Sequence, residues 1–310
     1  MKKKILFFCP SQEKMARELA SQNPQIILGE INWREFEDGF PNLKVVDPTA
    51  LIDADAAFLA DFSSATEIFR QLAVIYALPS YGLNSLKVFL LYFSTGTMDR
   101  ISEYGEVVTA KTLARMLSVI PAAASSAQII ICDIHALQEL HYFSDQVRVR
   151  HVTAIDLLLE RLKSEKKDLA EYAIAFPDEG AYKRFHHYFA GYELIICEKR
   201  RLPDKRRVIT IKEGSPDGQR VIVIDDLILS GNTLLECSKV LYEHGAVSVE
   251  VYSAHGVCPK ESWRKFLAAG IKFYLTDSCP KTIAQISAVN PKPEDFAVIS
   301  LAPIILKEFI

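Results

Sequence analysis

Continuous apolar runs alternate with helical patterns along the chain. The apolar residues of runs such as Ile5–Cys9 and Val221–Ile224 occupy consecutive positions, which is typical of strands in sheets covered on both faces. Between these runs, apolar residues recur at helical spacing. The alternation predicts an α/β fold with mainly parallel sheets flanked by helices. We expect strands at residues 4–9, 56–61, 87–93, 127–134, 172–178, 192–197, 220–226, 247–255 and 271–278, and helices at residues 11–22, 65–78, 107–120, 154–167, 233–244 and 259–269.

The two halves of the chain share one feature. Residues 127–134 and 220–226 each form an apolar run that ends in acid just before a loop. A chain of 310 residues is long enough for two domains. We therefore expect two similar α/β domains, residues 1–150 and 151–310, with roughly the last 20 residues packing on either one. Gly245 and Gly270 lie where helix C-terminal caps belong.

Composition and charge narrow the class of protein. A net charge of −3 gives no overall basic surface for nucleic acid. The six cysteines show no CxxC pair, which indicates reduced thiols rather than a disulfide framework or a zinc site. Pro10 ends the first apolar run, and Val88–Phe93 is far shorter than the ~18 apolar residues that span a bilayer. We expect a soluble, cytoplasmic protein with no membrane partner.

One expected strand ends on two carboxylates and leads into a hydroxyl-rich turn. Asp225 and Asp226 follow the apolar run, and the turn Ser230–Thr233 opens a helical pattern. Ligands of open α/β sheets bind beyond the carboxyl ends of strands. The N–H groups at the start of a helix favour an anion there. Gly231 allows positive φ, and Asn232 is one of the few other residues that tolerate it. The stretch therefore indicates a site for a sugar phosphate.

A purely structural interpretation of the same turn stays open. Thr233 and Glu236 have the spacing of a capping box, in which the threonine caps the helix and the glutamate bonds back to it. Capping is compatible with phosphate binding, but it leaves Asp225 and Asp226 unexplained.

With these residues in view, the chain resembles phosphoribosyl diphosphate (PRPP) synthetases, also called ribose-phosphate diphosphokinases, and most closely their plant-type second class. The segments that carry the resemblance lie in order along nearly the whole chain: FEDGFPNLKV, YFSTGTMDR, CDIHALQELHYF, AFPDEGAYKRFHHY, CEKRRLPDKRR, VIVIDDLILSGNTL and AHGVCPKESW. The resemblance implies two phosphoribosyltransferase-like domains. It also implies transfer of the β,γ-diphosphoryl group of MgATP to the C1 hydroxyl of ribose 5-phosphate, and assembly into a homo-oligomer.

The resemblance also assigns roles to His135 and to residues in the second half of the chain. His135 and Asp178 match the Mg²⁺ ligands, and His135 also helps to hold ATP. Asp178 and Gly180 belong to the loop that receives the diphosphate, and Lys199 and Arg201 match a catalytic Lys-x-Arg pair. Taken alone, a histidine here is more often structural, FPDEG resembles a tight turn, and KRRLPDKRR resembles a solvated loop. For the two acids and the turn after them, the resemblance implies that they bind ribose 5-phosphate. These residues are Asp225, Asp226, Ser230, Gly231, Asn232 and Thr233.

The nucleotide side follows the family less closely. Phe36 and Asp38 match residues at the ATP base and ribose, contributed to a neighbouring subunit. The segment Thr97–Asp99 replaces an Arg-Gln-Asp run of the commoner class, although Arg100 could still reach a phosphate. A broader nucleotide preference is therefore a reasonable hypothesis. The turn differs as well, because Asn232 stands where relatives usually have a second glycine.

Two other functions share parts of this pattern. A phosphoribosyltransferase that consumes PRPP has the acidic turn but needs no ATP-binding domain. That function therefore leaves the first 150 residues unexplained. A non-catalytic regulatory subunit of synthetases would be expected to lose the basic pair or the Mg²⁺ ligands, and all of these residues are present.

Overall fold

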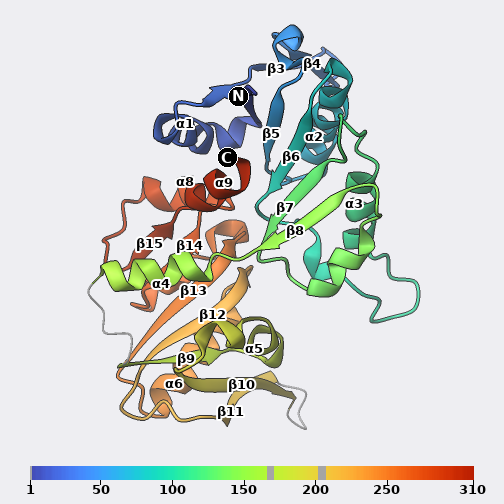
Figure 1. Cartoon of the computed structure of the whole chain (residues 1–310). Helices are drawn as coiled ribbons and strands as arrows, with labels where there is room; N and C mark the ends of the chain where they lie inside the picture. The colour runs from blue at the N-terminus through green and yellow to red at the C-terminus, as the bar shows by residue number, and fades with distance from the viewer. Residues whose placement is uncertain (1, 166–170, 202–206) are drawn as a thin grey trace. The chain divides into compact units, whose positions relative to one another are not determined.

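The computed structural model describes residues 2–165, 171–201 and 207–310, and the chain divides into two units (Figure 1). Unit 1 comprises Met1–Thr153 and Ala302–Ile310, and unit 2 comprises Ala154–Leu301. The last nine residues of the chain therefore belong to the same unit as its first half.

Unit 1 is built on a parallel sheet. Among the described residues this sheet has six strands in the order β2-β1-β5-β6-β7-β8. In Figure 1, α2 and α3 lie along one side of the sheet, and α1 and α9 lie along the other. The bounds are β1 Lys4–Phe8, α1 Glu13–Gln22, β2 Ile26–Leu28, β5 Asp55–Ala60, α2 Ala65–Ala77, β6 Ser85–Leu90, α3 Thr109–Ser118, β7 Gln128–Cys132, β8 Arg148–Val152 and α9 Ala302–Phe309.

Unit 2 is built on a larger sheet, which in the described part of the chain has the order β11-β10-β9-β12-β13-β14-β15. Its strands are parallel except for the edge pair β10–β11. The bounds are α4 Ile155–Ser164, β9 Tyr172–Phe176, α5 Glu179–Phe185, β10 Glu193–Arg201, β11 Arg207–Glu213, β12 Arg220–Ile228, α6 Asn232–Glu243, β13 Ser248–Gly256, α7 Arg264–Ala268, β14 Phe273–Thr276, α8 Pro280–Ala288 and β15 Phe296–Ile299.

The continuous apolar run of β12 has a direct explanation. Val221 and Val223 face a buried cluster that includes residues of α6, whereas Ile222 and Ile224 face a second cluster that includes residues of α4 and α5. Both faces of the sheet are therefore apolar, as the consecutive pattern predicts for a sheet covered by helices. The expected α/β fold with mainly parallel sheets is confirmed.

Several local expectations need correction. The expected helix at residues 259–269 is the short α7, preceded by a 3-10 turn at Pro259–Glu261 in which Lys260 and Glu261 have positive φ. The sequence pattern also gave no sign of α5, α8, α9, β2, β8, β11, β15 or the antiparallel pair β3 (Ile31–Glu35) and β4 (Pro41–Val45). Other 3-10 turns cover Pro10–Gln12, Pro48–Leu51, Leu78–Tyr81, Gly96–Met98, Leu137–Tyr142 and His186–Phe189. Gly245 and Gly270 do end α6 and α7 with positive φ.

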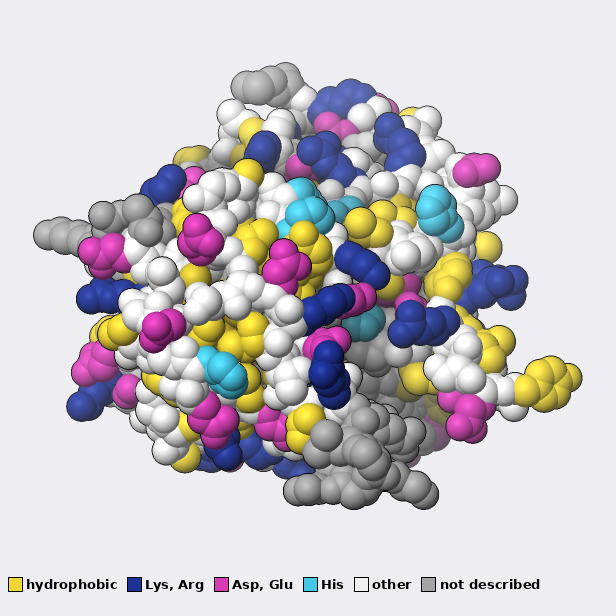
Figure 2. Space-filling model, turned by 90° about the horizontal axis from the view of Figure 1, so that it is seen from below, with side chains coloured by type: hydrophobic (Ala, Val, Ile, Leu, Met, Phe, Trp, Pro, Cys, Tyr) yellow, Lys and Arg dark blue, Asp and Glu magenta, His cyan; other side chains and the backbone are white. Residues whose placement is uncertain are grey.

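The surface mixes both signs of charge. On the face drawn in Figure 2, basic and acidic side chains are interspersed among scattered hydrophobic ones. All six cysteines carry free thiols, and five of them are buried. In the described ranges, none of the helices has the length and apolar character that a bilayer crossing requires.

Two glycines of unit 2 predict a difference in stability. Gly214 and Gly218 both have positive φ, but an added Cβ at Gly214 would lie 2.3 Å from the carbonyl oxygen of Leu194, whereas at Gly218 it would meet nothing within 4 Å. Gly218→Ala should cost about 1–2 kcal/mol of unfolding free energy, because only the left-handed conformation is strained. Gly214→Ala should cost roughly 1–3 kcal/mol more, because β10 must shift. Urea unfolding of both variants measures this, and equal losses would contradict the described packing.

Candidate active site

Asp178 begins the helix that follows β9. Its backbone is extended, and its Oδ1 accepts a hydrogen bond from the N–H of Ala181 at 3.1 Å, so it is the N-cap of α5. A Cβ at Gly180 would lie 3.1 Å from the same oxygen, so glycine keeps the space beside the carboxylate open. The FPDEG stretch is therefore a helix start rather than only a tight turn.

Lys199 contacts this carboxylate. The β10 strand is parallel to β9 and continues past its end, which brings Nζ of Lys199 to 3.2 Å from Oδ2 of Asp178. Both side chains are partly exposed, at 42% and 37%. Two residues that the resemblance assigned to different roles are thus in direct contact. The backbone of Arg201 ends β10 and pairs with Arg207, but its side chain lies outside the described residues.

The two acids of β12 have different surroundings. Asp226 is 5% exposed, and its Oδ2 lies 3.1 Å from Nη1 of Arg184 on α5. Asp225 is half-buried, and burial raises its pKa well above the ordinary value, with the charges of Asp226 and Asp178 adding to the effect. Burial disfavours the charged carboxylate, and nearby negative charges do the same. Asp178, Asp225 and Asp226 therefore form one electrostatically linked group, here called the carboxylate cluster.

The strand does not end on these acids, contrary to expectation. It continues to Ile228, because the long neighbour β13 pairs with it up to Gly256. The other neighbour, β9, pairs with β12 only as far as Val223. Asp225 and Asp226 therefore lie beyond the paired part of β9, at the same edge of the sheet as Asp178.

The turn Ser230–Thr233 also differs from the capping-box interpretation. The N-cap of α6 is Gly231, with φ 73°, which has no side chain to cap the helix, and the first helical N–H, that of Asn232, donates to Oγ of Ser230 at 3.4 Å. Thr233 is therefore inside the helix, and the box with Glu236 does not form. The positive φ expected at Gly231 is confirmed, whereas Asn232 is the first residue of α6 and has no positive φ. An uncapped helix start leaves N–H groups for an anion.

In unit 1, His135 follows the buried strand β7. It is half-buried, and a Cβ at Gly96 would lie 3.2 Å from its Cβ and 3.3 Å from Oε2 of Glu139. Oε1 of Glu139, which is fully buried, accepts the N–H of Ala136 at 2.8 Å. The loops after β6 and β7 therefore meet at Gly96, with His135 beside them.

The other residues expected on the nucleotide side are exposed. The Arg100 side chain is 82% exposed, and its Nε lies 4.0 Å from Oδ1 of Asp99. Phe36 is 56% exposed at the tip of the β3–β4 pair, where its N–H donates to the carbonyl of Phe40 at 2.8 Å. Oδ1 of Asp38 accepts the N–H of Phe40 at 3.0 Å and so shapes this tip.

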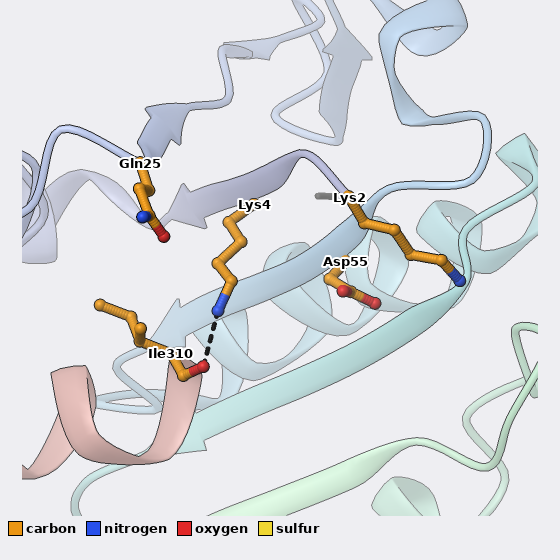
Figure 3. A pocket seen from close by; sticks show the side chains of 5 residues that line it. All are labelled: Lys2, Lys4, Gln25, Asp55 and Ile310. Carbon is orange, nitrogen blue, oxygen red and sulfur yellow. Dashed lines mark hydrogen bonds between the residues drawn. The ribbon is translucent and has the colours of Figure 1, made fainter.

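A hollow of unit 1 lies elsewhere. It has a volume of about 590 Å³ and is lined by Lys2, Lys4, Gln25, Asp55 and Ile310 (Figure 3). Lys4 and Asp55 are the first residues of β1 and β5, so the hollow is at the amino ends of the parallel strands, opposite the edge that carries His135. Nζ of Lys4 donates to the carbonyl oxygen of Ile310 at 2.8 Å, which ties the last helix to the sheet.

The carboxylate cluster fits a divalent cation. Asp178 offers carboxylate oxygens, one of which already accepts a cation, Lys199. In the described part of the chain, no three His, Cys, Asp or Glu residues converge as a complete metal site. Mg²⁺ is commonly held by one or two carboxylates together with waters and substrate phosphates, so a single carboxylate suffices.

Sequence reasoning missed two cations of this site, Arg184 and Lys265. Arg184 contacts Asp226, and Nζ of Lys265 donates to the carbonyl of Ser230 at 3.0 Å. These contacts join residues 42 and 35 positions apart along the chain, so no local pattern marks them. Arg184 and Lys265 also lie in segments that contain other basic residues, so the sequence alone does not distinguish them from their neighbours.

The two acids of β12 predict opposite effects on stability. The pKa of Asp225 is raised in the folded state, so stability falls as pH rises from the unfolded pKa toward the folded one. Asp225→Asn keeps the neutral form and should therefore raise the free energy of unfolding at neutral pH. Asp226→Asn should instead cost about 3–5 kcal/mol, because it leaves the Arg184 guanidinium buried without its carboxylate.

Urea unfolding of both variants at pH 5 and pH 8 checks this pair. The Asp225→Asn gain should be larger at pH 8, because the carboxylate it removes is more fully ionised there. A change of the same sign in both variants would contradict the described arrangement.

Comparisons with known proteins agree on one family. The chain is 45% identical to "Ribose-phosphate pyrophosphokinase 4" of Oryza sativa subsp. japonica, over 97% of this chain and 94% of that protein. It is 44% identical to "Ribose-phosphate pyrophosphokinase 3, mitochondrial" of Spinacia oleracea, over 97% and 75%. The fold matches a phosphoribosylpyrophosphate synthetase structure from Mycobacterium smegmatis with a TM-score of 0.83 and 21% identity, over 99% and 98% of the chains. A scan against protein-family models found no match.

Proposed function

Because the chain belongs to the ribose-phosphate pyrophosphokinase family, we propose that it transfers the β,γ-diphosphoryl group of MgATP to the C1 hydroxyl of ribose 5-phosphate. The products are PRPP and AMP, and the reaction serves nucleotide biosynthesis. The structural observation that links this reaction to particular residues is the contact between Lys199 and Asp178. It lies at the carboxyl ends of two neighbouring parallel strands.

Lys199 and Arg201 are the proposed catalytic residues. Diphosphoryl transfer requires little covalent chemistry from the protein, so the rate depends on positioning and on stabilising charge on the transferring oxygens. The ammonium of Lys199 lies beside the loop proposed to receive the diphosphate, Asp178–Gly180, which supports its role. Arg201 follows two positions later in the sequence and is the last residue of β10.

Asp178 and His135 are the residues that would hold Mg²⁺. The partial exposure of Asp178 and the space left by Gly180 support this assignment. When bound with ATP, the ion would neutralise part of the triphosphate charge. Lys199, whose Nζ already lies beside Asp178, would present its ammonium to the transferring oxygens.

The ribose 5-phosphate is proposed to bind along β12 and the start of α6. Its phosphate would accept hydrogen bonds from the turn Ser230–Thr233, whose helix start is uncapped. Its ring hydroxyls would contact Asp225 and Asp226. The ion pair with Arg184 supports a fixed orientation of the second acid. The C1 hydroxyl would attack the β-phosphorus in line, and a loose transition state needs no dedicated general base.

Unit 1 is proposed to supply the ATP side through His135 and Arg100, and unit 2 the sugar-phosphate side. Phe36 and Asp38 would contact the nucleotide of a neighbouring subunit in a homo-oligomer. The exposed aromatic tip of the β3–β4 pair supports this, because an exposed Phe36 and Phe40 offer apolar surface to a partner. We keep the cytoplasm as the proposed compartment, which the free thiols support.

The first test is ³¹P NMR of the purified protein with Mg²⁺, ATP and ribose 5-phosphate. We expect AMP and a C1 diphosphate to appear together. ADP in place of AMP would mean a simple phosphokinase and would overturn the mechanism. Absence of turnover despite ATP binding would favour a regulatory subunit. Base-dependent release of diphosphate from PRPP would instead indicate a phosphoribosyltransferase.

Two neighbouring basic residues give a matched comparison. Lys199→Ala should lower kcat by roughly 10²–10³-fold, because a preorganised charge is lost from the transition state. Arg200→Ala is the control, since its Nε lies 2.5 Å from Oε1 of Glu198 and successive side chains of a strand point to opposite faces. Steady-state rates at saturating substrates give kcat for the two variants and for the wild type. Equal losses in the two variants would contradict the role of Lys199.

A further inference from the structure

The turn Ser230–Thr233 and the residue before it, Leu229, are braced by a second segment of unit 2. Ser262 donates its hydroxyl to the carbonyl of Leu229. Nζ of Lys265 donates to the carbonyl of Ser230 at 3.0 Å, and the ring of Phe266 lies 2.8 Å from where a Cβ on Gly231 would be. Three successive positions, Leu229 to Gly231, are thus contacted from the side of Ser262–Phe266. This bracing turns the carbonyls toward the second segment and fixes the turn.

Lys265 has a second partner in the turn. Its Nζ donates to Oδ1 of Asn232 at 2.8 Å, so the lysine bridges Ser230 and the first residue of α6. Asn232 is the residue that stands where the resemblance leads one to expect glycine. Because Asn232 has helical rather than positive φ, its backbone does not explain the exchange. The side chain of Asn232 explains the exchange, since its amide oxygen accepts the hydrogen bond from Lys265.

The charge of Lys265 is not offset locally. Its two acceptors are neutral, and among the described residues no carboxylate forms an ion pair with it. A cation near the N-terminus of a helix is unfavourable, because that end already carries partial positive charge. The arrangement thus concentrates positive charge beside free N–H groups, and an anion bound at the turn would relieve the repulsion.

We propose that Lys265, held in place by Asn232, determines the preference of this site for the 5-phosphate dianion of its sugar substrate. The inference rests on the proposed function, since it assigns a further residue to the ribose 5-phosphate turn. Hydroxyl and N–H donors of the turn are neutral, so they distinguish weakly between a phosphate dianion and an uncharged sugar. A full positive charge makes that distinction, and hydrogen bonds to charged groups are stronger than those between neutral groups.

Calorimetric titration of ribose 5-phosphate into the intact protein tests the proposal, together with KM and kcat. Lys265→Met should weaken ribose 5-phosphate binding and raise its KM roughly 10- to 100-fold. The KM for ATP and kcat should change little, and Lys265→Arg should restore most of the affinity. A role confined to bracing the turn would instead lower kcat and thermal stability, which these readouts separate.

Asn232 provides the second variant. Asn232→Ala should raise the KM for ribose 5-phosphate by a smaller factor than Lys265→Met does. In the Lys265→Met background, Asn232→Ala should have almost no further effect on KM, because both substitutions remove the same Lys265–Asn232 hydrogen bond. The control is Lys239→Met, a lysine on the same helix whose Nζ lies 3.7 Å from Oε1 of Glu243. It should leave ribose 5-phosphate binding unchanged.

The outcomes separate the inference from the function. If the wild-type protein forms PRPP and Lys265→Met binds ribose 5-phosphate as tightly as wild type, the inference is wrong and the function stands. If the wild type forms no PRPP but binds ribose 5-phosphate, the function is wrong and the calorimetric comparison still decides on Lys265. If the wild type does neither, both are wrong.

Discussion

The structure depends on how unit 2 accommodates three carboxylates at one edge of a sheet. Asp178, Asp225 and Asp226 repel one another. Burial raises the pKa of Asp225, and the charges of Asp226 and Asp178 raise it further. Two cations offset this repulsion in the free protein. Arg184 pairs with Asp226 in a nearly buried position, and Lys199 pairs with Asp178 where water reaches both. Two of the three carboxylates therefore already contact a cation in the free protein.

Strand lengths place these groups together. β10 continues past β9 because β11 pairs with it on the outer side, which carries Lys199 beyond the end of β9. β12 continues past β9 because β13 is equally long, which carries the two aspartates to the same level. α5 begins at the carboxylate of Asp178 and brings Arg184 back toward β12. A single short strand, β9, therefore leaves the space that its longer neighbours line.

The sequence is informative where one residue type has one physical role. Consecutive apolar residues identified most central strands, and Gly231, Gly245 and Gly270 have the positive φ that their positions require. The sequence was less informative where the start of a helix or the partner of a charged side chain depends on tertiary contacts. Thr233 and Glu236 satisfy a capping pattern, yet the N-cap lies two residues earlier, at Gly231, which takes the left-handed conformation. Arg184 and Lys265 could not be found by pattern, because their partners are distant in sequence.

The most direct test of this account is the pKa of Asp225, measured by carbon-13 NMR titration of the aspartate carboxyls in the substrate-free protein. Comparison with Asp225→Asn assigns the signal. The account predicts titration well above the ordinary value of 3.8, and a lower pKa for Asp225 when Asp178→Asn removes one neighbouring charge. An ordinary pKa that is unaffected by Asp178→Asn would contradict the claim that the three carboxylates act as one cluster.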